Sequence, residues 1–281
     1  TPKIMIDLGK IEINEKIADV GGSFAKVLSA SVDGWNCCIK ELVLDDPDTA
    51  TNFETEISVL ENLPIHQNIV RYLYHNRTEL KLRLFMTRYS GTLRNFIEKK
   101  IARNNGYYSL QEISRYFYDI LNGLSFLHKY GIIHRDLKSD NIFVTLNEGG
   151  SISRLSIGDF DTAKNMKGAS MCMTVIGTPS FIAPEVLNAR GGGGYSFKAD
   201  IFSLGMLLYE LITLKSPYYE CSMLEVSMRI LKGVRPTMPD MPEAYAPFVE
   251  MHRVCTETDP DRRPTTTELL ERLRSEARNH G

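Results

Sequence analysis

The chain has 281 residues, of which 43% are hydrophobic and 24% charged, and its formal net charge is −2. This composition fits a globular protein with room for one large core or two modest ones, and it excludes fibrous and disordered classes. Lys and Arg (33) nearly balance Asp and Glu (35), so no basic stripe suits a nucleic acid backbone. No apolar run is long enough to span a membrane and no signal-peptide pattern is present, so we expect a soluble, cytoplasmic protein.

The start of the chain and its cysteines add two expectations. The sequence begins with Thr1 rather than Met, so we expect a piece of a longer protein. The five cysteines include no pair at metal-ligand spacing, and we expect reduced thiols that pack as small core residues.

Strand-like patterns dominate the first ninety residues. Apolar and polar residues alternate in three segments, which are residues 4–44, 69–75 and 80–86. Between the first two, apolar residues at helical spacing predict one helix over residues 48–63. The polar stretch 87–92 follows the last strand. We therefore expect a small β-rich lobe that ends at this stretch.

Helical patterns dominate the rest of the chain. Ser109 and Glu112 form a capping box that predicts the start of a long helix, which Gly131 ends. Four more segments have apolar residues at helical spacing, namely residues 198–213, 223–232, 245–255 and 265–278. The sequence thus predicts an α+β chain. It combines a small antiparallel β-sheet lobe with one helix, over residues 1–88, and a larger, mainly helical lobe, over residues 89–281.

The segment His134–Asn141 reads His-Arg-Asp-Leu-Lys-Ser-Asp-Asn and follows the long predicted helix. It resembles the catalytic loop of protein kinases. The resemblance implies that Asp136 accepts the proton of the substrate hydroxyl, Lys138 neutralises the transferring phosphoryl group and Asn141 holds a magnesium ion. Phosphoryl transfer needs such groups to converge, because it depends on positioning and charge neutralisation. The alternative is a plain polar turn, which a match of this length disfavours.

The tripeptide Asp159-Phe160-Asp161 stands where the family has Asp-Phe-Gly. The resemblance implies that Asp159 is a magnesium ligand together with Asn141. Asp161 replaces a glycine, and aspartate adopts fewer backbone conformations than glycine. We expect Asp161 to stiffen a flip of this segment, so that inhibitors of the flipped state bind poorly and Asp161→Gly restores their binding.

The segment Cys37–Lys40 stands where the family has Val-Ala-Ile-Lys on its third strand. The resemblance implies that Lys40 and a glutamate of the following helix grip the α- and β-phosphates of ATP. Glu54 and Glu56 are both candidates for this glutamate. Helical spacing relative to the apolar residues places Glu56 on the inward face, which favours it over Glu54.

The expected ATP site extends to a loop and to the linker between the lobes. Residues Val20–Val27 align with the glycine-rich loop of the family, but Val20 and Ala25 replace two of its glycines, so we expect a looser clamp on ATP. The linker Thr87–Gly91, with Met86 at its entrance, is expected to contact adenine. The expected ATP-contacting residues are Val20, Gly21, Gly22, Ser23, Phe24, Val27, Cys38, Lys40, Met86, Thr87, Tyr89 and Asp159. The expected metal is Mg²⁺, with Mn²⁺ as an alternative.

The segment that ends in Ala183-Pro184-Glu185 resembles the activation loop of the family. Within it, Thr178 stands at the position that bonds the catalytic residues in serine/threonine kinases. Arg135 implies a positively charged binding site for a phosphate group. Ser170 and Thr174 are the candidate phosphorylation sites. Ordinary polar loop residues are the alternative for both.

Two further matches concern the framework rather than the substrate. Asp200 is expected to brace the backbone of the catalytic loop, and Arg263 is expected to pair with Glu185. Both positions are implied by the resemblance.

The resemblance covers residues 12–275 and implies a bilobal protein kinase fold. It implies a serine/threonine kinase that transfers the γ-phosphate of ATP to protein substrates, including itself, under control of activation-loop phosphorylation. The segments Lys138–Asn141 and Pro179–Glu185 resemble those of the tyrosine-kinase-like group, and within it those of the leucine-rich-repeat kinases. The alternatives are a nucleotide-binding pseudokinase that acts as an allosteric or scaffolding module, and a small-molecule kinase. The oligomeric state stays open.

Overall fold

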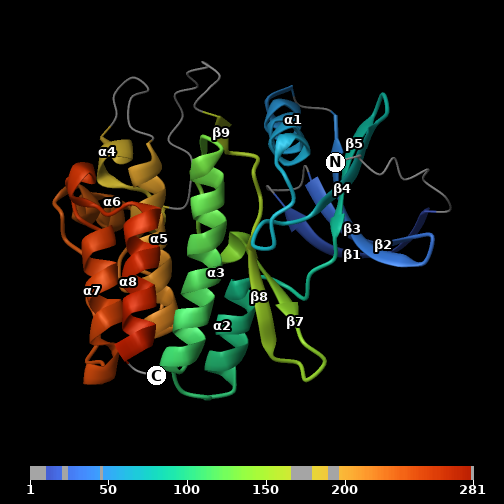
Figure 1. The fold of residues 1–281 in the computed structure, drawn as a ribbon. Helices are drawn as coiled ribbons and strands as arrows, with labels where there is room; N and C mark the ends of the chain where they lie inside the picture. Colours follow the sequence, from blue (N-terminus) through green and yellow to red (C-terminus); the bar gives the residue numbers. More distant parts are fainter. Residues whose placement is uncertain (1–10, 21–24, 45–46, 166–178, 189–195, 280–281) are drawn as a thin grey trace.

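The structure is a computed structural model, and it describes residues 11–20, 25–44, 47–165, 179–188 and 196–279. Its strands and helices separate into two lobes. Figure 1 shows a twisted sheet with one helix on the right and a group of helices on the left. This arrangement confirms the predicted α+β class.

The first lobe is built on a five-stranded antiparallel sheet with the order β1-β2-β3-β5-β4. Its strands are β1 (Ile11–Val20), β2 (Ala25–Val32), β3 (Trp35–Val43), β4 (Tyr72–Arg77) and β5 (Lys81–Thr87). The single helix α1 (Pro47–Asn62) lies where the sequence predicted it. Strand β4 begins later than predicted, because Ile69 and Val70 pair with Ile157 of the second lobe instead.

The second lobe is mainly helical. Its helices are α2 (Leu93–Ala102), α3 (Leu110–Lys129), α4 (Pro184–Leu187), α5 (Phe197–Thr213), α6 (Met223–Leu231), α7 (Ala246–Cys255) and α8 (Thr266–Asn279). Its short strands are β6 (Ile132–Ile133), β7 (Ile142–Leu146), β8 (Ile152–Ile157) and β9 (Lys164–Asn165), paired as β6 with β9 and β7 with β8. The sequence analysis did not predict α2, because only Leu93 and Ile97 of this helix are buried.

The predicted capping box of α3 is present and fixes the start of this helix. The Ser109 hydroxyl accepts from the Glu112 backbone N–H, and the Glu112 carboxylate accepts from the Ser109 backbone N–H. Such a cap satisfies two backbone donors that a helix start leaves without partners. Helix α3 thereby begins at a defined residue and delivers the following segment to a defined place.

One cluster of buried apolar side chains joins the two lobes. It extends from α1 and β5 through Phe160 to α3 and α5, and α5 is buried on nearly all of its faces. Full burial of one such leucine or phenylalanine contributes about 1.5–3 kcal/mol relative to exposure. Among the described residues, no helix combines the length and the apolar character needed to cross a membrane.

Candidate active site

The segment His134–Asn141 lies between the end of α3 and the start of β7. Gly131 ends the helix with φ of +79°, a conformation that residues other than glycine adopt at a cost. The two-residue strand β6 follows, and Ser139–Asn141 forms a short 3-10 helix before β7. The loop is therefore fixed at both ends by regular structure.

Asp200, a fully buried carboxylate on α5, holds the start of this loop. It accepts hydrogen bonds from the backbone N–H groups of His134, at 2.9 Å, and Arg135, at 3.0 Å, and from the His128 ring, at 2.9 Å. Burial by itself raises the pKa of Asp200, but the hydrogen bond and charge of His128 outweigh it and hold the pKa below its usual range. Arg135 has φ of +71°, so Asp200 stabilises a backbone conformation that is costly for a non-glycine residue.

Two polar side chains of the loop, Lys138 and Asn141, contact Asp136. The Lys138 ammonium lies 2.7 Å from Asp136 Oδ2. The Asn141 amide nitrogen donates to the Asp136 carbonyl oxygen, at 2.8 Å, and to Oδ2, at 3.0 Å. The Asp136 carboxylate is thus held by a cation and an amide. Because the Asn141 amide nitrogen donates to Asp136, the Asn141 side-chain carbonyl oxygen faces away from Asp136.

Lys40 on β3 connects three elements of the protein. Its ammonium lies 2.7 Å from Glu56 Oε2 on α1 and 2.8 Å from Asp159 Oδ1, which follows β8. Lys40 and Glu56 are nearly fully buried, whereas the Asp159 side chain is 22% exposed. Of the two candidate glutamates, Glu56 therefore faces Lys40. Glu54 is exposed and pairs with Arg77.

Burial and the charges of this triad together shift the pKa values of its members. Burial by itself lowers the pKa of Lys40, but the carboxylates of Asp159 and Glu56 outweigh it and raise the pKa. Burial raises the pKa of Glu56 to about 7, against the opposite effect of Lys40. Burial would also raise the pKa of Asp159, but the nearby Lys40 holds it below its usual range. Lys40 thus stays protonated, and its positive charge is available to a polyanion.

Phe160 links Asp159 to the core. Its ring is fully buried, 5.2 Å from the His134 ring in an edge-to-face arrangement, and its backbone N–H donates to Glu56 Oε1 at 3.3 Å. Asp159 has φ of +62°, which aims its carboxylate at Lys40 while Phe160 points into the core. Gly158 permits this close packing, because an added Cβ would lie 2.5 Å from Val70.

Asp161, which stands in place of the family glycine, is half-buried. Burial and the nearby Asp159 carboxylate raise the pKa of Asp161. Its φ lies outside the left-handed region, so this conformation does not require glycine at the position. The prediction that Asp161 stiffens a flip of the segment is compatible with this backbone and stays a prediction.

Comparison with known proteins agrees with this geometry. A sequence model of the protein kinase domain matches residues 15–273. The chain belongs to the protein kinase family. The kinase and exchange factor for Rac B of Dictyostelium discoideum is 36% identical over 287 residues, which cover 99% of this chain and 25% of that protein. Mitogen-activated protein kinase kinase kinase 1 of Arabidopsis thaliana is 34% identical, with 89% of this chain and 40% of that protein covered.

The name of a third relative states the residue types that it modifies. Serine/threonine-protein kinase Nek9 of Mus musculus is 30% identical over 217 residues, which cover 77% of this chain and 21% of that protein. The chain therefore spans between about a fifth and two fifths of the length of these relatives. The resemblance to the tyrosine-kinase-like group stays a prediction.

The kinase fold brings most of the expected adenine-side residues together. Val27 of β2 is opposite Lys40 of β3, and Cys38 is opposite Met86 of β5. The Cys38 thiol contacts the carbonyl oxygen of Thr87 at 3.6 Å, and burial raises its pKa to about 12. Cys38 and Met86 therefore lie beside the start of the linker, and their contact with ATP stays a prediction.

Tyr89 of the linker is anchored to the second lobe. Its hydroxyl accepts from the backbone N–H of Arg71, at 3.1 Å, and its ring lies 5.6 Å from the Phe143 ring on β7. The Tyr89 side chain is thus committed to this packing, and the contact of Tyr89 with a nucleotide stays a prediction. Among the other expected residues, Val20 ends β1 opposite Ala25. Those that lie outside the described residues are Gly21, Gly22, Ser23, Phe24, Ser170, Thr174 and Thr178.

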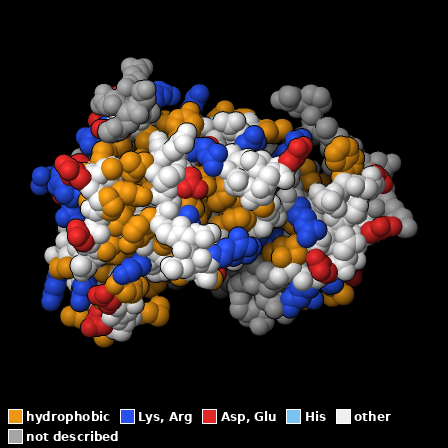
Figure 2. Space-filling view, turned by 90° about the horizontal axis from the view of Figure 1, so that it is seen from below, with side chains coloured by type: hydrophobic (Ala, Val, Ile, Leu, Met, Phe, Trp, Pro, Cys, Tyr) orange, Lys and Arg blue, Asp and Glu red, His pale blue; other side chains and the backbone are white. Residues whose placement is uncertain are grey.

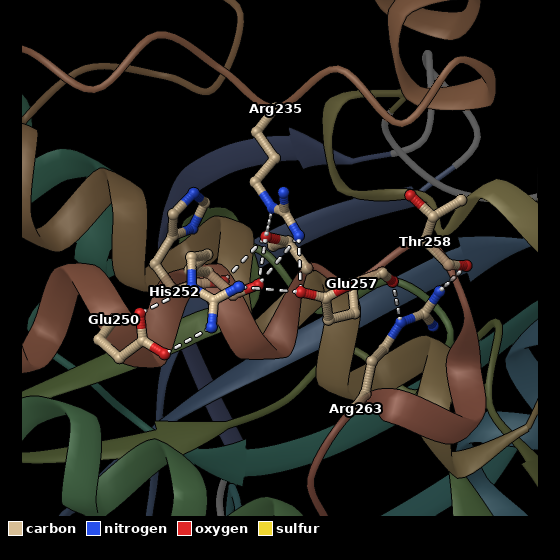
Figure 3. Close-up of polar contacts among 8 residues, drawn as sticks. Arg235, Glu250, His252, Glu257, Thr258 and Arg263 are labelled. Atoms are coloured by element: carbon tan, nitrogen blue, oxygen red, sulfur yellow. Dashed lines mark hydrogen bonds and ion pairs between the residues drawn. The ribbon is translucent and has the colours of Figure 1, made fainter.

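The expected pair of Arg263 and Glu185 is present and bidentate, with two contacts of 2.7 Å. Figure 3 shows further contacts of Arg263, which also donates to the carbonyl oxygens of Glu257 and Thr258. In the same view, Arg235 pairs with the Glu257 carboxylate at 3.1 Å. Arg263 is 1% exposed, and its burial is tolerable because its donors have partners. This network fixes α4, which follows the activation segment.

Two contacts near the site escaped the sequence analysis. His128 contacts Asp200, and Arg94 of α2 lies 2.6 Å from the buried Glu210 of α5. Burial raises the pKa of Glu210 to about 7, although the Arg94 charge opposes this. The only local signal was the presence of Asp200 and Glu210 in the largely apolar helix α5, and this signal does not indicate which residues pair with them.

Proposed function

We propose that this chain is a catalytically active protein serine/threonine kinase that transfers the γ-phosphate of ATP to hydroxyl groups of protein substrates. The observation that carries the proposal is the contact of the Lys40 ammonium with carboxylates from both lobes, Glu56 at 2.7 Å and Asp159 at 2.8 Å. A kinase needs this alignment to hold ATP. The charged residues of the catalytic loop give the proposal further support.

ATP would be held by its phosphates and by the linker. The Lys40 ammonium binds the α- and β-phosphates, and Glu56 fixes the direction of the lysine side chain. Cys38, Met86 and the backbone of the linker line the adenine side. Lys40 is suited to this role because its charge is retained in a buried place.

The residues present fit a bound Mg²⁺. Lys40 contacts Oδ1 of Asp159, which leaves Oδ2 for a metal ion, and the Asn141 carbonyl oxygen faces away from Asp136. Both are oxygen ligands, which Mg²⁺ and Mn²⁺ prefer. When bound there, the ion supplies positive charge to the β- and γ-phosphates. Asp159 and Asn141 are thus the proposed metal ligands.

Asp136 and Lys138 act on the acceptor side. The Asp136 carboxylate orients the substrate hydroxyl and accepts its proton, while the hydroxyl oxygen bonds to the γ-phosphorus and the bond from that phosphorus to the β–γ bridging oxygen breaks. Lys138, 2.7 Å from Asp136, neutralises charge on the transferring group. The presence of Lys138 in the catalytic loop and the similarity to the serine/threonine-protein kinase Nek9 both favour Ser and Thr over Tyr as acceptors.

Regulation is proposed at the activation segment. Arg135, beside the catalytic aspartate, would bind a phosphate group on Ser170 or Thr174, and Thr178 would bond the catalytic residues. The kinase itself is a candidate source of that phosphate. The identity of the protein substrates belongs to the full-length protein.

One alternative has specific support. Asp161 replaces a glycine, and Val20 and Ala25 replace two glycines of the phosphate-covering loop. These changes favour a pseudokinase that binds nucleotide without transferring phosphate. The same test separates the two functions.

The test is intact-mass analysis of the purified chain after incubation with Mg²⁺ and ATP, with a Ser/Thr peptide mixture as additional acceptor. We expect phosphate on the wild type and on the peptides. Asp136→Asn should lower the transfer rate by about 10²- to 10⁴-fold, because it removes the proton acceptor and keeps the shape of the side chain. The control Asp240→Asn removes an exposed carboxylate elsewhere and should keep the rate. Nucleotide binding without transfer by the wild type would favour the pseudokinase.

A further inference from the structure

A cavity of about 380 Å³ lies in the helical lobe, and neither Lys40 nor the catalytic loop lines it. Its walls come from α2, the α2–α3 connection, the first turns of α3 and the β7–β8 hairpin, all of which lie at the bottom of Figure 1. Ser90 of the linker also lines it, but none of the proposed catalytic or metal-binding residues does. We call it the basic pocket, after the side chains Lys99, Lys100, Arg103 and Arg115 that line it.

Positive charge in the basic pocket is not balanced by its own acids. Glu112 is the one carboxylate among the lining residues, and it already accepts from the Ser109 backbone N–H and hydroxyl at 2.8 and 2.9 Å. Within the described residues, no ion pair involves Lys99, Lys100 or Arg103. Unbalanced cations around a concave site attract an anionic ligand.

Aromatic rings form the floor beneath these cations. The Lys99 ammonium lies 5.0 Å from the Phe96 ring centre, and the Lys100 ammonium lies 4.7 Å from that of Tyr108. The Tyr108 and Tyr116 rings meet edge to face at 5.3 Å. Burial raises the pKa of both phenols, so they stay neutral. Tyr108 and Tyr116 are 4% and 2% exposed and hold the cations in place, whereas the half-buried Phe96 ring leaves apolar area on the floor.

The guanidinium of Arg115 is fixed at the hairpin side. It lies 5.2 Å from the Tyr116 ring centre and donates to the carbonyl oxygen of Ile152 at 2.6 Å. Leu146 and Ile152 add apolar side chains on that side. The pocket thus combines a cationic rim with an apolar floor. Figure 2, which faces this end of the molecule, likewise shows Lys and Arg side chains lying among apolar ones.

We propose that the basic pocket docks an acidic peptide segment of a protein partner. Asp and Glu side chains of that segment pair with Lys99, Lys100 and Arg103, and one apolar side chain covers the aromatic floor. A compact phosphate group would meet the cations but leave the floor exposed, which favours the peptide. Such docking recruits a partner without occupying the active site, and it does not depend on phosphoryl transfer by this chain.

The test uses a fluorescein-labelled octapeptide of Asp and Glu with one central Leu, measured by fluorescence anisotropy on the wild-type chain. Reversing two exposed cations, in the double variant Lys99→Glu with Arg103→Glu, should weaken binding at least about tenfold. The control double variant Lys129→Glu with Lys232→Glu removes the same charge, also from helix C-termini, and should change binding less than about twofold. Replacing the peptide Leu by Ser should weaken binding about tenfold, because it removes the apolar contact with the floor.

Three results would overturn the proposal. Equal weakening in both double variants would show general charge attraction. No saturable binding to the wild type would remove the docking site altogether. Displacement of the peptide by pyrophosphate, together with no effect of the Leu replacement, would assign the pocket to phosphate groups instead. Phosphoryl transfer to a peptide without acidic residues should be equal in both double variants, which separates docking from catalysis.

Discussion

The two charged centres of this kinase are built in different ways. At the junction of the lobes, the side chains of Glu56 and Asp159 both contact the side chain of Lys40, from three separate segments. Beneath the catalytic loop, Asp200 bonds instead to backbone N–H groups of His134 and Arg135. Contacts between side chains can break and re-form while the backbone stays in place. Contacts to the backbone are part of the fold itself.

This difference divides function from stability. A buried ion pair adds little net stability, because desolvation offsets the attraction between its charges. Backbone donors left without partners in the core cost about 1–3 kcal/mol each. We therefore expect substitutions at the lobe junction to weaken ATP binding most, and substitutions of Asp200 to lower the stability of the fold most.

The largest expected effect on stability follows removal of the Asp200 carboxylate. Asp200→Ala leaves two buried backbone N–H groups and His128 without their acceptor, so the free energy of unfolding should fall by about 3–5 kcal/mol. Urea unfolding followed by circular dichroism measures this. Asp200→Asn keeps one acceptor oxygen and should lose less, and the exposed control Asp240→Ala should lose less than about 0.5 kcal/mol. A loss as small as the control's would contradict the assigned role of Asp200.

A smaller effect should depend on pH. His252 on α7 is buried, and its Nδ1 donates to the Gly205 carbonyl oxygen of α5 at 2.9 Å. Burial lowers its pKa from 6.5 to about 4, so between these values the unfolded chain binds more protons and stability falls as the pH falls. The free energy of unfolding should therefore decrease by about 2 kcal/mol from pH 7 to pH 5 through this group.

The variant His252→Asn isolates that contribution. Its amide can donate to the same carbonyl oxygen and does not titrate, so urea unfolding at pH 7 and pH 5 should differ less than in the wild type. An equal pH dependence of both proteins would show that other groups cause the acid sensitivity.

Local patterns predicted most elements of the fold. The capping box Ser109–Glu112, the stop at Gly131 and the periodic segments predicted α3, α5, α6, α7 and α8 to within a few residues, but not the short α4. Helix α2 was missed because its buried face is narrow, and the start of β4 was misplaced because Ile69 pairs with the other lobe. Where contacts between distant segments decide the bounds of an element, the local sequence does not indicate those bounds.

The candidate site shows the same limit. Short motifs indicated Asp136, Asn141 and Asp159, because their roles depend on spacing within a loop. The contacts of His128 with Asp200 and of Arg94 with Glu210 join residues far apart in the chain, and the local sequence does not indicate which residues pair. The basic pocket likewise needs three distant segments to be brought together.

The most direct test of the lobe junction as the nucleotide–metal site is calorimetric titration of ADP with and without Mg²⁺. The wild type should bind ADP more tightly with Mg²⁺, and Asp159→Asn should abolish that difference, because it removes the proposed metal ligand that also contacts Lys40. The matched control Asp161→Asn changes the acid two residues later and should keep the difference. Full Mg²⁺ dependence in Asp159→Asn would contradict the assignment.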